Sequence, residues 1–223
     1  MAVPSLFTFL QGEPNANSAL ASADQIWRWS TVNATWTKYY YMSANRGKVK
    51  RWVKDGDTEK AEDGYIRETT DAIPAGETFF FKRMGDTAVV LSLAGAVKPF
   101  DATAFFQVGK EGLAFAANPF PVAMDVKGFS TYYLDGEPNA NSAMESADQI
   151  WRWSTANAAW TKYYYMSANR GKVKRWVKDG DTEKADDGYI RATPDQIPAG
   201  EGFFFKRMGD ANVTIKIGMP TAE

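Results

Sequence analysis

Residues 26–42 read IWRWSTVNATWTKYYYM, and residues 150–166 read IWRWSTANAAWTKYYYM. Each stretch contains two runs rich in aromatic and β-branched residues, separated by a short connection around an asparagine. Such runs, bounded by turn residues, are typical of short antiparallel strands. The first stretch therefore predicts strands over residues 26–30 and 35–42, and the second stretch predicts the same pair again.

The repetition extends well beyond these strands. Residues 12–86 and 136–210 match without a gap at an offset of 124 and differ at only nine of 75 positions. A period this long indicates two whole units rather than the short repeats of a solenoid, and each unit is close to the usual size of a domain. We expect an internal duplication, with one β module in residues 1–94 and another in residues 95–223.

The rest of the chain has the same short-strand character. Further strands are expected at residues 48–53, 64–67, 78–84, 88–93, 104–108 and 113–117, with hairpin turns at residues 85–86 and 109–112. One helical turn is expected within residues 17–24, because Asn17 and Ser18 are good N-caps. The whole pattern predicts an all-β fold of two similar antiparallel modules, each a small sandwich or barrel-like sheet pair.

The composition excludes several classes of function. The chain has no cysteine and no histidine, which rules out disulfides, thiolate nucleophiles, Cys/His metal sites and Ser-His-Asp catalysis. The 26 basic residues balance 27 acidic ones, so a nucleic-acid partner, which requires a basic excess, is not expected. Carboxylates and lysines remain available for catalysis, but we expect a protein that is not an enzyme and uses no cofactor.

No apolar run reaches the roughly 18 residues of a membrane-spanning helix, so no membrane span is expected. Residues 1–11 lack the basic start and the small-residue cleavage site of a signal peptide. Two interpretations remain open at this point: a cytosolic protein, or an exported one whose signal peptide has been removed.

Three motifs occur in an order that resembles modules of secreted and cell-surface repeat proteins from Gram-negative bacteria. They are NPFP at residues 118–121, ADQIWRW at 147–153 and IPAGEGFFF at 197–205. The resemblance covers most of the second copy and, without NPFP, most of the first. It implies an all-β module that is extracellular or at the cell surface, its signal peptide removed. The chain departs from the modules at residues 113–115, which read LAF where they commonly have WNL.

Aromatic residues are unusually frequent, with 8 Trp, 10 Tyr and 14 Phe. Strand alternation places Trp27 and Trp29 on one face, and it places Tyr39 and Tyr41 opposite Tyr40. Aromatic residues on both faces leave three interpretations open: core packing, contact with other subunits, or sugars stacked on an aromatic platform. We expect the pairs Trp27/Trp29 and Trp151/Trp153 to be equivalent and mostly buried.

A basic stripe is the next candidate for ligand or partner binding. In the first copy Lys48, Lys50 and Trp52 are expected on one strand face, and in the second copy the equivalents are Lys172, Lys174 and Trp176. Lysines beside a tryptophan suit an acidic glycan or an acidic protein surface. The alternative is a solvated hairpin whose lysines guard a sheet edge.

The segments that begin DGDTE resemble the start of a calcium loop. The weak candidate ligands are Asp55 and Asp57, with Asp179 and Asp181 as their equivalents. The EF-hand pattern fails, however, because Lys60 occupies the position of its glycine. We expect no metal there and favour a solvated, charged loop.

Self-association is predicted from an apparent imbalance between the copies. Residues 100–124 precede the second copy, but the chain has no equivalent segment before the first copy. The strands that this segment would pair with are therefore expected to leave open sheet edges. The candidate interface residues are Phe7, Phe9, Val213, Ile215 and Ile217. Head-to-tail pairing of these ends would build rings or filaments, whereas pairing within one chain would give a closed monomer.

These observations predict a non-enzymatic extracellular structural protein that associates with itself, such as a subunit of a surface layer, matrix or filament. The alternative is a carbohydrate-binding adhesin that uses its aromatic strand faces to bind glycans. The expected partners are thus copies of the chain or glycans.

Overall fold

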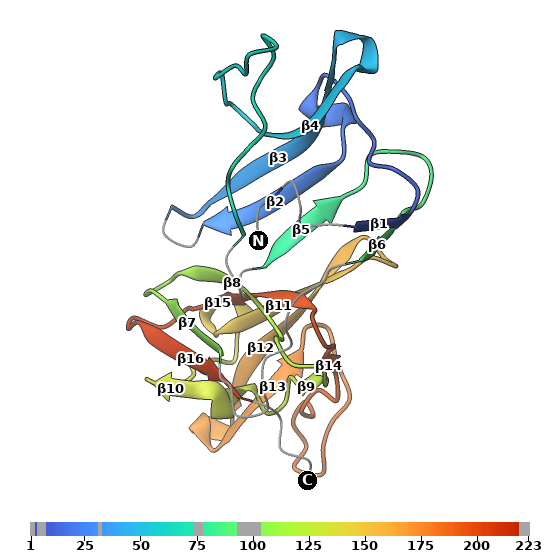
Figure 1. Ribbon diagram of the computed structural model, residues 1–223. Coiled ribbons are helices and arrows are strands. Elements are labelled where there is room, and N and C mark those ends of the chain that lie inside the picture. Colours follow the sequence, from blue (N-terminus) through green and yellow to red (C-terminus); the bar gives the residue numbers. More distant parts are fainter. Residues whose placement is uncertain (1–2, 4–7, 31–32, 74–77, 93–103, 219–223) are drawn as a thin grey trace. The chain divides into compact units, whose positions relative to one another are not determined.

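The computed structural model describes residues 3, 8–30, 33–73, 78–92 and 104–218. The chain forms two compact units, Met1–Ala96 (unit 1) and Val97–Glu223 (unit 2). The regular elements are β-strands and short 3-10 helices, so the all-β prediction is confirmed (Figure 1). Among the described residues, no helix has the length and apolar character needed to cross a membrane.

Unit 1 contains a four-stranded antiparallel sheet in the order β4-β3-β2-β5, and β1 pairs separately with β6. The strands are β1 (Thr8–Gln11), β2 (Gln25–Ser30), β3 (Thr35–Ala44), β4 (Val49–Lys54), β5 (Phe79–Lys82) and β6 (Val90–Ser92). The 3-10 helices are η2 (Leu20–Ser22) and η3 (Asn45–Gly47). The expected helical turn is thus present in 17–24, as η2.

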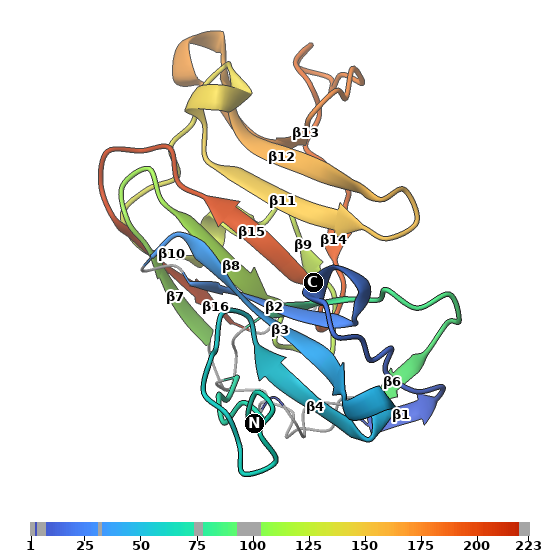
Figure 2. The ribbon, with the colours of Figure 1, turned by 90° about the horizontal axis from the view of Figure 1, so that it is seen from above.

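Unit 2 contains a five-stranded sheet β13-β12-β11-β15-β8, a three-stranded sheet β10-β16-β7 and the pair β14-β9 (Figure 2). The strands are β7 (Ala104–Val108), β8 (Leu113–Ala117), β9 (Met124–Asp125), β10 (Tyr133–Asp135), β11 (Gln149–Ser154), β12 (Ala159–Ala168), β13 (Val173–Lys178), β14 (Gln196–Ile197), β15 (Gly202–Lys206) and β16 (Val213–Ile217). The 3-10 helices are η4 (Phe129–Tyr132), η5 (Met144–Ser146) and η6 (Asn169–Gly171).

The strand pair quoted at the outset forms in both units and in the same register. Trp29 lies opposite Trp36 in the β2–β3 ladder, and Trp153 lies opposite Trp160 in the β11–β12 ladder. Aromatic and β-branched side chains suit a pleated surface with close cross-strand neighbours. The local pattern was therefore sufficient to predict these strands.

The predicted hairpin of residues 104–117 is wrong, although both of its strands exist. β7 pairs with β16 and β8 pairs with β15, so the turn between them carries the chain from one sheet to the other. In this turn the Gly112 amide donates to the Gly109 carbonyl at 2.9 Å. A Cβ atom on Gly112 would lie only 2.7 Å from that oxygen, so the turn requires glycine.

Two other strand predictions are also wrong. Residues 78–84 and 88–93 do not pair with each other, because β5 pairs with β2 and β6 pairs with β1. The connection curves around Arg83, whose Nε donates to the Thr87 carbonyl at 3.0 Å. Residues 64–67 form no strand, and Ile66 makes only an isolated bridge with Lys60.

The core of unit 2 lies between its five-stranded and three-stranded sheets, as in a β-sandwich. Ile215 of β16 and Phe205 of β15 are fully buried in one cluster. Phe129 packs against Phe203, Phe205 and Trp176, with ring centroids 5.7 Å apart in each pair. Burying large aromatic rings is the main source of stability in such a core.

The head-to-tail edge prediction is wrong for the C-terminal strand. β16 has a neighbour on each side, β10 and β7, so its backbone is not an open edge. Val213, Ile215 and Ile217 are 2%, 0% and 1% exposed, because they face the core. At the other end, Phe9 lies in β1, which pairs with β6, and Phe7 lies outside the described residues.

Asn118 links the NPFP and IPAG motifs. Its side chain is fully buried, and its amide donates to the Ile197 carbonyl at 3.1 Å and to the Pro198 carbonyl at 3.2 Å. Its Oδ1 atom accepts the Phe120 amide at 3.2 Å. A buried side-chain amide whose donors and acceptor are all hydrogen-bonded stabilises the fold. These hydrogen bonds therefore explain why the NPFP and IPAG motifs occur together in one unit.

Candidate functional site

The outer side of each main sheet carries a cluster of aromatic rings, called here the aromatic face. Residues directly opposite each other in a ladder point to the same side, so indoles from β2 and β3 meet there. In unit 1 the Trp29 and Trp36 centroids are 5.1 Å apart, and Phe80 lies 5.7 Å from Trp36. The face comprises Trp27, Trp29, Trp36 and Phe80 in unit 1, and Phe115, Trp151, Trp153, Trp160 and Phe204 in unit 2.

Unit 2 repeats this arrangement and extends it by one strand. Trp153 and Trp160 have centroids 5.2 Å apart at an interplanar angle of 67°. Phe115 of β8 stacks on Phe204 at 4.6 Å. Trp160 is 36% exposed, which is high for an indole.

The paired tryptophans are equivalent in the two units, as expected, and all four are intermediate in exposure, so most of each side chain is covered, but they do not face the main core. The side of the sheet that faces the core carries Ile26 and Arg28 instead, and Ile26 is fully buried. Alternation along a strand then directs Trp27 and Trp29 away from that core.

Lysines flank the aromatic face in both units. Lys38 Nζ lies 4.5 Å from the Trp27 ring centroid, and Lys162 Nζ lies 4.9 Å from that of Trp151. A second lysine, Lys82 or Lys206, lies near the same ring at 5.4 or 5.7 Å. These are cation–π distances, so the lysine ammonium groups occupy the π surface of each of these indoles.

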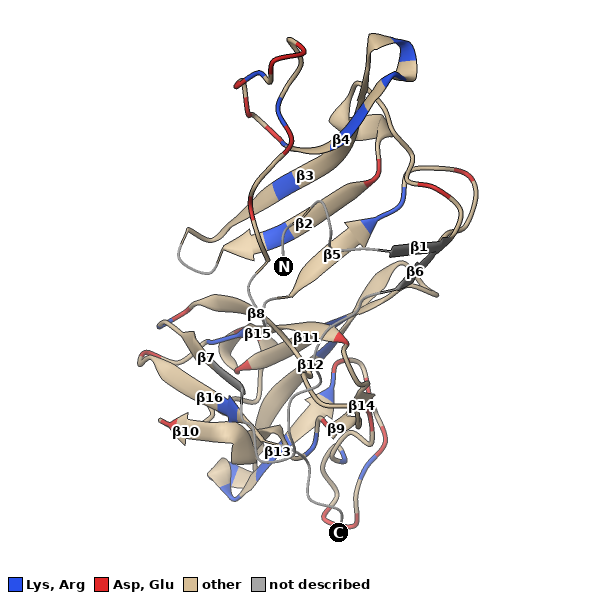
Figure 3. Ribbon diagram, viewed as in Figure 1, with Lys and Arg blue, Asp and Glu red and all other residues tan. Residues whose placement is uncertain are grey.

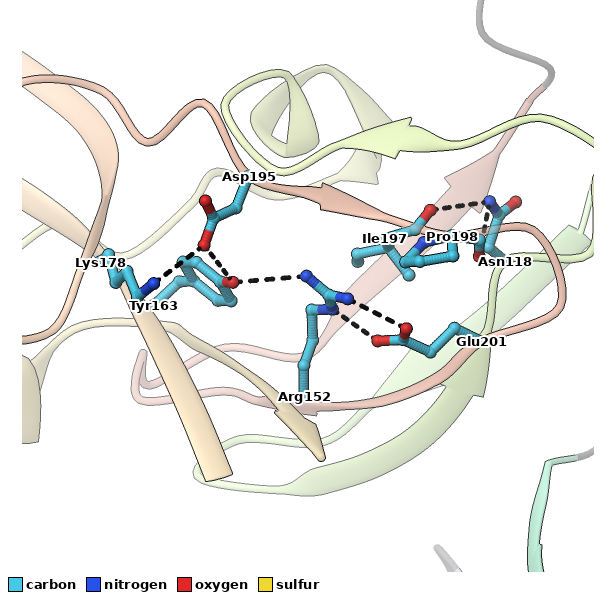
Figure 4. Close-up of polar contacts among 8 residues, drawn as sticks. All are labelled: Asn118, Arg152, Tyr163, Lys178, Asp195, Ile197, Pro198 and Glu201. Atoms are coloured by element: carbon cyan, nitrogen blue, oxygen red, sulfur yellow. Dashed lines mark hydrogen bonds and ion pairs between the residues drawn. The ribbon is translucent and has the colours of Figure 1, made fainter. Parts of the chain in front are cut away.

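A row of polar side chains runs along the opposite, core-facing side of the unit 2 sheet (Figure 4). The Tyr163 hydroxyl donates to Asp195 Oδ2 at 2.7 Å, and Lys178 Nζ lies 3.4 Å from the same oxygen. Arg152 donates to the Tyr163 hydroxyl at 3.4 Å. Arg152 also donates from Nε and Nη2 to the two carboxylate oxygens of Glu201, at 2.5 and 2.9 Å.

Unit 1 builds the same row from equivalent residues. The Tyr39 hydroxyl donates to Asp71 Oδ2 at 2.8 Å, and Lys54 Nζ lies 3.1 Å from that oxygen. Arg28 donates to the Tyr39 hydroxyl at 3.3 Å. Burial, reinforced by the hydrogen bond to Asp71, raises the pKa of Tyr39 to about 12. The tyrosine therefore stays a neutral donor near neutral pH.

Shallow hollows adjoin this row. In unit 2, Asp195 lines two of them, each of about 300 Å³. One is lined by Lys178, Asp179, Gly180, Asp181, Arg191, Thr193, Pro194 and Asp195, and the other by Arg152, Trp153, Ser154, Thr155, Ala156, Thr161, Tyr163, Asp195 and Glu201. In unit 1 the equivalent of the first hollow has a volume of about 280 Å³ and is lined by Lys54, Asp55, Gly56, Asp57, Arg67, Thr69, Thr70 and Asp71.

The basic stripe does not form the surface that the sequence predicts. Trp52 and Trp176 are 5% and 0% exposed, and each packs in the core against a neighbouring tyrosine at 5.3 Å. They cannot reach a surface ligand, so their prediction as binding residues is wrong. The core covers the middle of each strand, where Trp52 and Trp176 lie. Lys50 and its equivalent Lys174 lie nearer the strand ends and are exposed.

The first lysines of the stripe lie outside the strands altogether. Lys48 and Lys172 follow the 3-10 helices η3 and η6 in a helical backbone conformation. Strand alternation therefore does not apply to them. Both are exposed on the β3–β4 and β12–β13 connections.

The calcium candidates are engaged by protein groups. Asp57 Oδ1 accepts the Glu59 amide at 3.0 Å, and Asp57 Oδ2 lies 3.5 Å from Arg67 Nε. Asp181 has the same two contacts in unit 2. Asp55 and Asp179 line the hollows described above. Within the described ranges, no group of three or more acidic side chains has a geometry that could hold a metal ion.

Sequence reasoning missed the polar row and its hollows. One signal was present: alternation places Arg28 on the same strand face as Ile26, and a charge on a face that becomes buried requires a partner. The partners lie far along the chain, however. Arg152 and Glu201 are 49 residues apart, and Tyr163 and Asp195 are 32 residues apart.

No family model, curated protein or solved structure matches the chain. The likeness to bacterial surface modules accordingly stays a prediction from three motifs.

Proposed function

We propose that the chain is a non-enzymatic extracellular structural protein that associates with copies of itself through its aromatic faces. One observation carries this proposal: each unit presents the same half-buried cluster of indoles, with lysines on either side. Partly exposed aromatic clusters are a common feature of protein–protein interfaces. Tryptophan in particular contributes much of the binding energy in such interfaces.

The number of faces determines the kind of assembly. A face that binds its own equivalent makes a two-fold contact, and a chain with one such face stops at a dimer. This chain has two, one in each unit. Two self-complementary faces per chain support growth beyond dimers, as a layer or filament requires. This route replaces strand-edge pairing of β16, whose two edges are both occupied.

The polar row supports a non-enzymatic role. The Glu201 carboxylate is engaged by Arg152 through two hydrogen bonds, and Asp195 accepts from Tyr163 beside Lys178. Both carboxylates thus serve as acceptors in a structural hydrogen-bond and ion-pair network. A tyrosine whose pKa is raised is a poor nucleophile.

Ring geometry favours self-association over the adhesin alternative at the aromatic face. Sugar stacking requires open, roughly coplanar ring faces. The indoles are instead tilted against each other, by 68° for Trp29 and Trp36, and lysines lie over Trp27. Tilted rings suit edge-to-face packing with the rings of another aromatic face.

Light scattering on three variants tests the proposal. The variants are Trp36→Glu, Trp160→Glu and the double variant, each of which places a charge in an aromatic face. We expect polymers for the wild type, dimers for each single variant and monomers for the double variant.

Lys48→Glu with Lys172→Glu is the matched control, because it introduces the same charges at exposed sites outside the face. This control should polymerise like the wild type. Near-UV circular dichroism checks that each variant stays folded. A wild type that remains monomeric at high concentration contradicts the proposal, as do folded variants that still polymerise.

A further inference from the structure

The hollows beside Asp195 have the properties of a binding site, and the first of them is lined by no residue of the aromatic face. They adjoin the row formed by Arg152 and Tyr163, whose side chains point to the core side of the sheet. Trp151 and Trp160 point to the other side. A ligand in the first hollow and a partner on the aromatic face would therefore contact opposite sides of the same sheet, whereas the second hollow also borders Trp153 of that face.

The polar groups at the site are held in place before any ligand arrives. The Asp195 carboxylate accepts from Tyr163, its own amide donates to Thr193 Oγ1 at 3.2 Å, and its carbonyl accepts the Val126 amide at 3.1 Å. Thr193 and Tyr163 are both fully buried. Such pre-organisation lowers the entropic cost of binding.

The charges in the first hollow exclude a strongly charged ligand. Acidic and basic residues are interspersed on the loop that follows β13, as Figure 3 shows. Arg191 pairs with Asp181 and Glu183, and Lys178 pairs with Asp195. A cation would meet the paired lysine and arginine, and an anion would meet the aspartates. A neutral ligand that both donates and accepts hydrogen bonds avoids either repulsion.

The lining also disfavours a peptide. Around the first hollow it consists of charged residues, glycine and threonine, with Pro194 as the one apolar residue in unit 2. Most peptide-recognition grooves anchor apolar side chains in apolar pockets, which this lining lacks. The hydroxyl groups of a sugar, by contrast, donate to carboxylates and accept from ammonium and guanidinium groups. Two adjoining hollows of about 300 Å³ accommodate more than one sugar ring.

The equivalent hollow in unit 1 is built from the same polar residues but has a different rim. Three of the nine sequence differences between the copies are close to its aspartate in sequence: Glu68/Ala192, Thr70/Pro194 and Ala72/Gln196. The Lys–Asp–Tyr–Arg row is unchanged across them. Thr70 adds a hydroxyl to the unit 1 lining where unit 2 has Pro194.

We propose that the hollow beside Asp195, and its equivalent beside Asp71, each bind a neutral oligosaccharide. Asp195 accepts from sugar hydroxyls, and Lys178 donates to sugar oxygens. In unit 2 the chain of sugars extends past Asp195 towards Arg152. The chain thus has two saccharide sites, one in each unit, and the hollows lined by Asp71 with Lys54 and by Asp195 with Lys178 contain no residue of the aromatic faces.

Isothermal titration calorimetry of the full-length chain tests this. The probes are the neutral pentasaccharides maltopentaose, cellopentaose and mannopentaose, with an oligogalacturonate of similar length as the acidic comparison. We expect at least one neutral probe to bind with two sites per chain and the acidic probe to bind at least about tenfold more weakly, because a charged ligand is repelled. Absence of binding by all three neutral probes overturns the proposal, as does equal binding of the acidic probe.

Two substitutions locate the sites. Asp195→Asn should leave only the unit 1 site, and Asp71→Asn should leave only the unit 2 site. The double variant should bind with an affinity at least about tenfold lower, because each site loses a charged acceptor. Asparagine can still accept from the tyrosine hydroxyl, so folding should be retained. The matched control is Asp187→Asn with Asp63→Asn, which lie in ion pairs outside the hollows and should keep both sites.

The double variant Trp36→Glu/Trp160→Glu separates this proposal from the proposed function. It should abolish association and keep two saccharide sites. If it loses both properties while folded, the sugar binds at the aromatic face, and the assignment to the hollows is overturned. Unaltered binding by folded Asp71→Asn/Asp195→Asn overturns it as well.

Discussion

Units 1 and 2 contain nearly the same sequence but bury it to different extents. Phe203 is fully buried, whereas its equivalent Phe79 is half-buried. The side chain of Arg207 is 6% exposed, against 23% for its equivalent Arg83. Because the residues are the same, the difference comes from their neighbours. Burial is thus a property of the assembled unit rather than of the local sequence.

The neighbours that differ are the strands of the middle segment. In unit 2, β8 lies along β15 and β7 lies along β16. Within the residues that the structure describes, β5 and β6 each have one partner strand, β2 and β1. Unit 2 also has Tyr133, whose hydroxyl donates to Asp148 at 2.9 Å, at the position that Phe9 occupies in unit 1.

The largest expected difference between the units involves the buried ion pair. Arg207 donates to the fully buried Asp148 at 2.6 Å, so Arg207→Met should destabilise unit 2 by about 3–5 kcal/mol. Arg83→Met should cost unit 1 less, because Arg83 is more exposed than Arg207, although its partner Asp24 is as fully buried as Asp148. Hydrogen exchange of β11 and β2 amides measures the two units separately. Equal losses would contradict the link between burial and stability.

The next difference concerns the aromatic core. Phe203→Ala should destabilise unit 2 by about 3–5 kcal/mol, because it leaves a cavity in a closed core. Phe79→Ala should have a smaller effect, since its ring is already partly exposed. Urea denaturation followed by tryptophan fluorescence compares the two, and a greater loss for Phe79→Ala would reverse the predicted order.

A smaller effect is expected at alkaline pH. The pKa of Tyr39 is raised by burial from its ordinary value of 10.0 to about 12, so the folded state retains this proton longer than the unfolded state. Its contribution to stability is complete below pH 10 and falls as the pH rises from about 10 to about 12. Tyr39→Phe should lose part of this pH dependence. Parallel stability curves for the variant and the wild type would contradict the prediction.

The smallest effect should be the same in both units. Arg51 of β4 pairs with Asp63, and Arg175 of β13 pairs with Asp187, so in each unit a strand arginine meets an exposed loop carboxylate with matching geometry. Exposed ion pairs contribute little because water screens them. Asp63→Asn and Asp187→Asn should each leave the urea midpoint unchanged. A clear shift of the urea midpoint for only one of the two variants would contradict the prediction, because the two ion pairs have matching geometry.

The sequence predicted local structure well at particular positions. Strand alternation placed Trp27 and Trp29 on one face of their strand, and it placed Tyr39 and Tyr41 opposite Tyr40 on the next strand; the ladders agree with both. It failed for Trp52 and Val213, which it assigned to surfaces although both are buried. Alternation identifies two faces of a strand, but it does not say which of them another layer will cover.

The sequence by itself determined the all-β class and the two faces of the central strands, because these follow from side-chain spacing over a few neighbouring residues. Only the tertiary structure decided that β7 and β8 belong to different sheets and that β16 is internal. It also decided that Arg152, Tyr163 and Asp195 meet beside a hollow. These outcomes depend on contacts between segments tens of residues apart, whose free energies are set by the packing of the whole unit rather than by any local pattern.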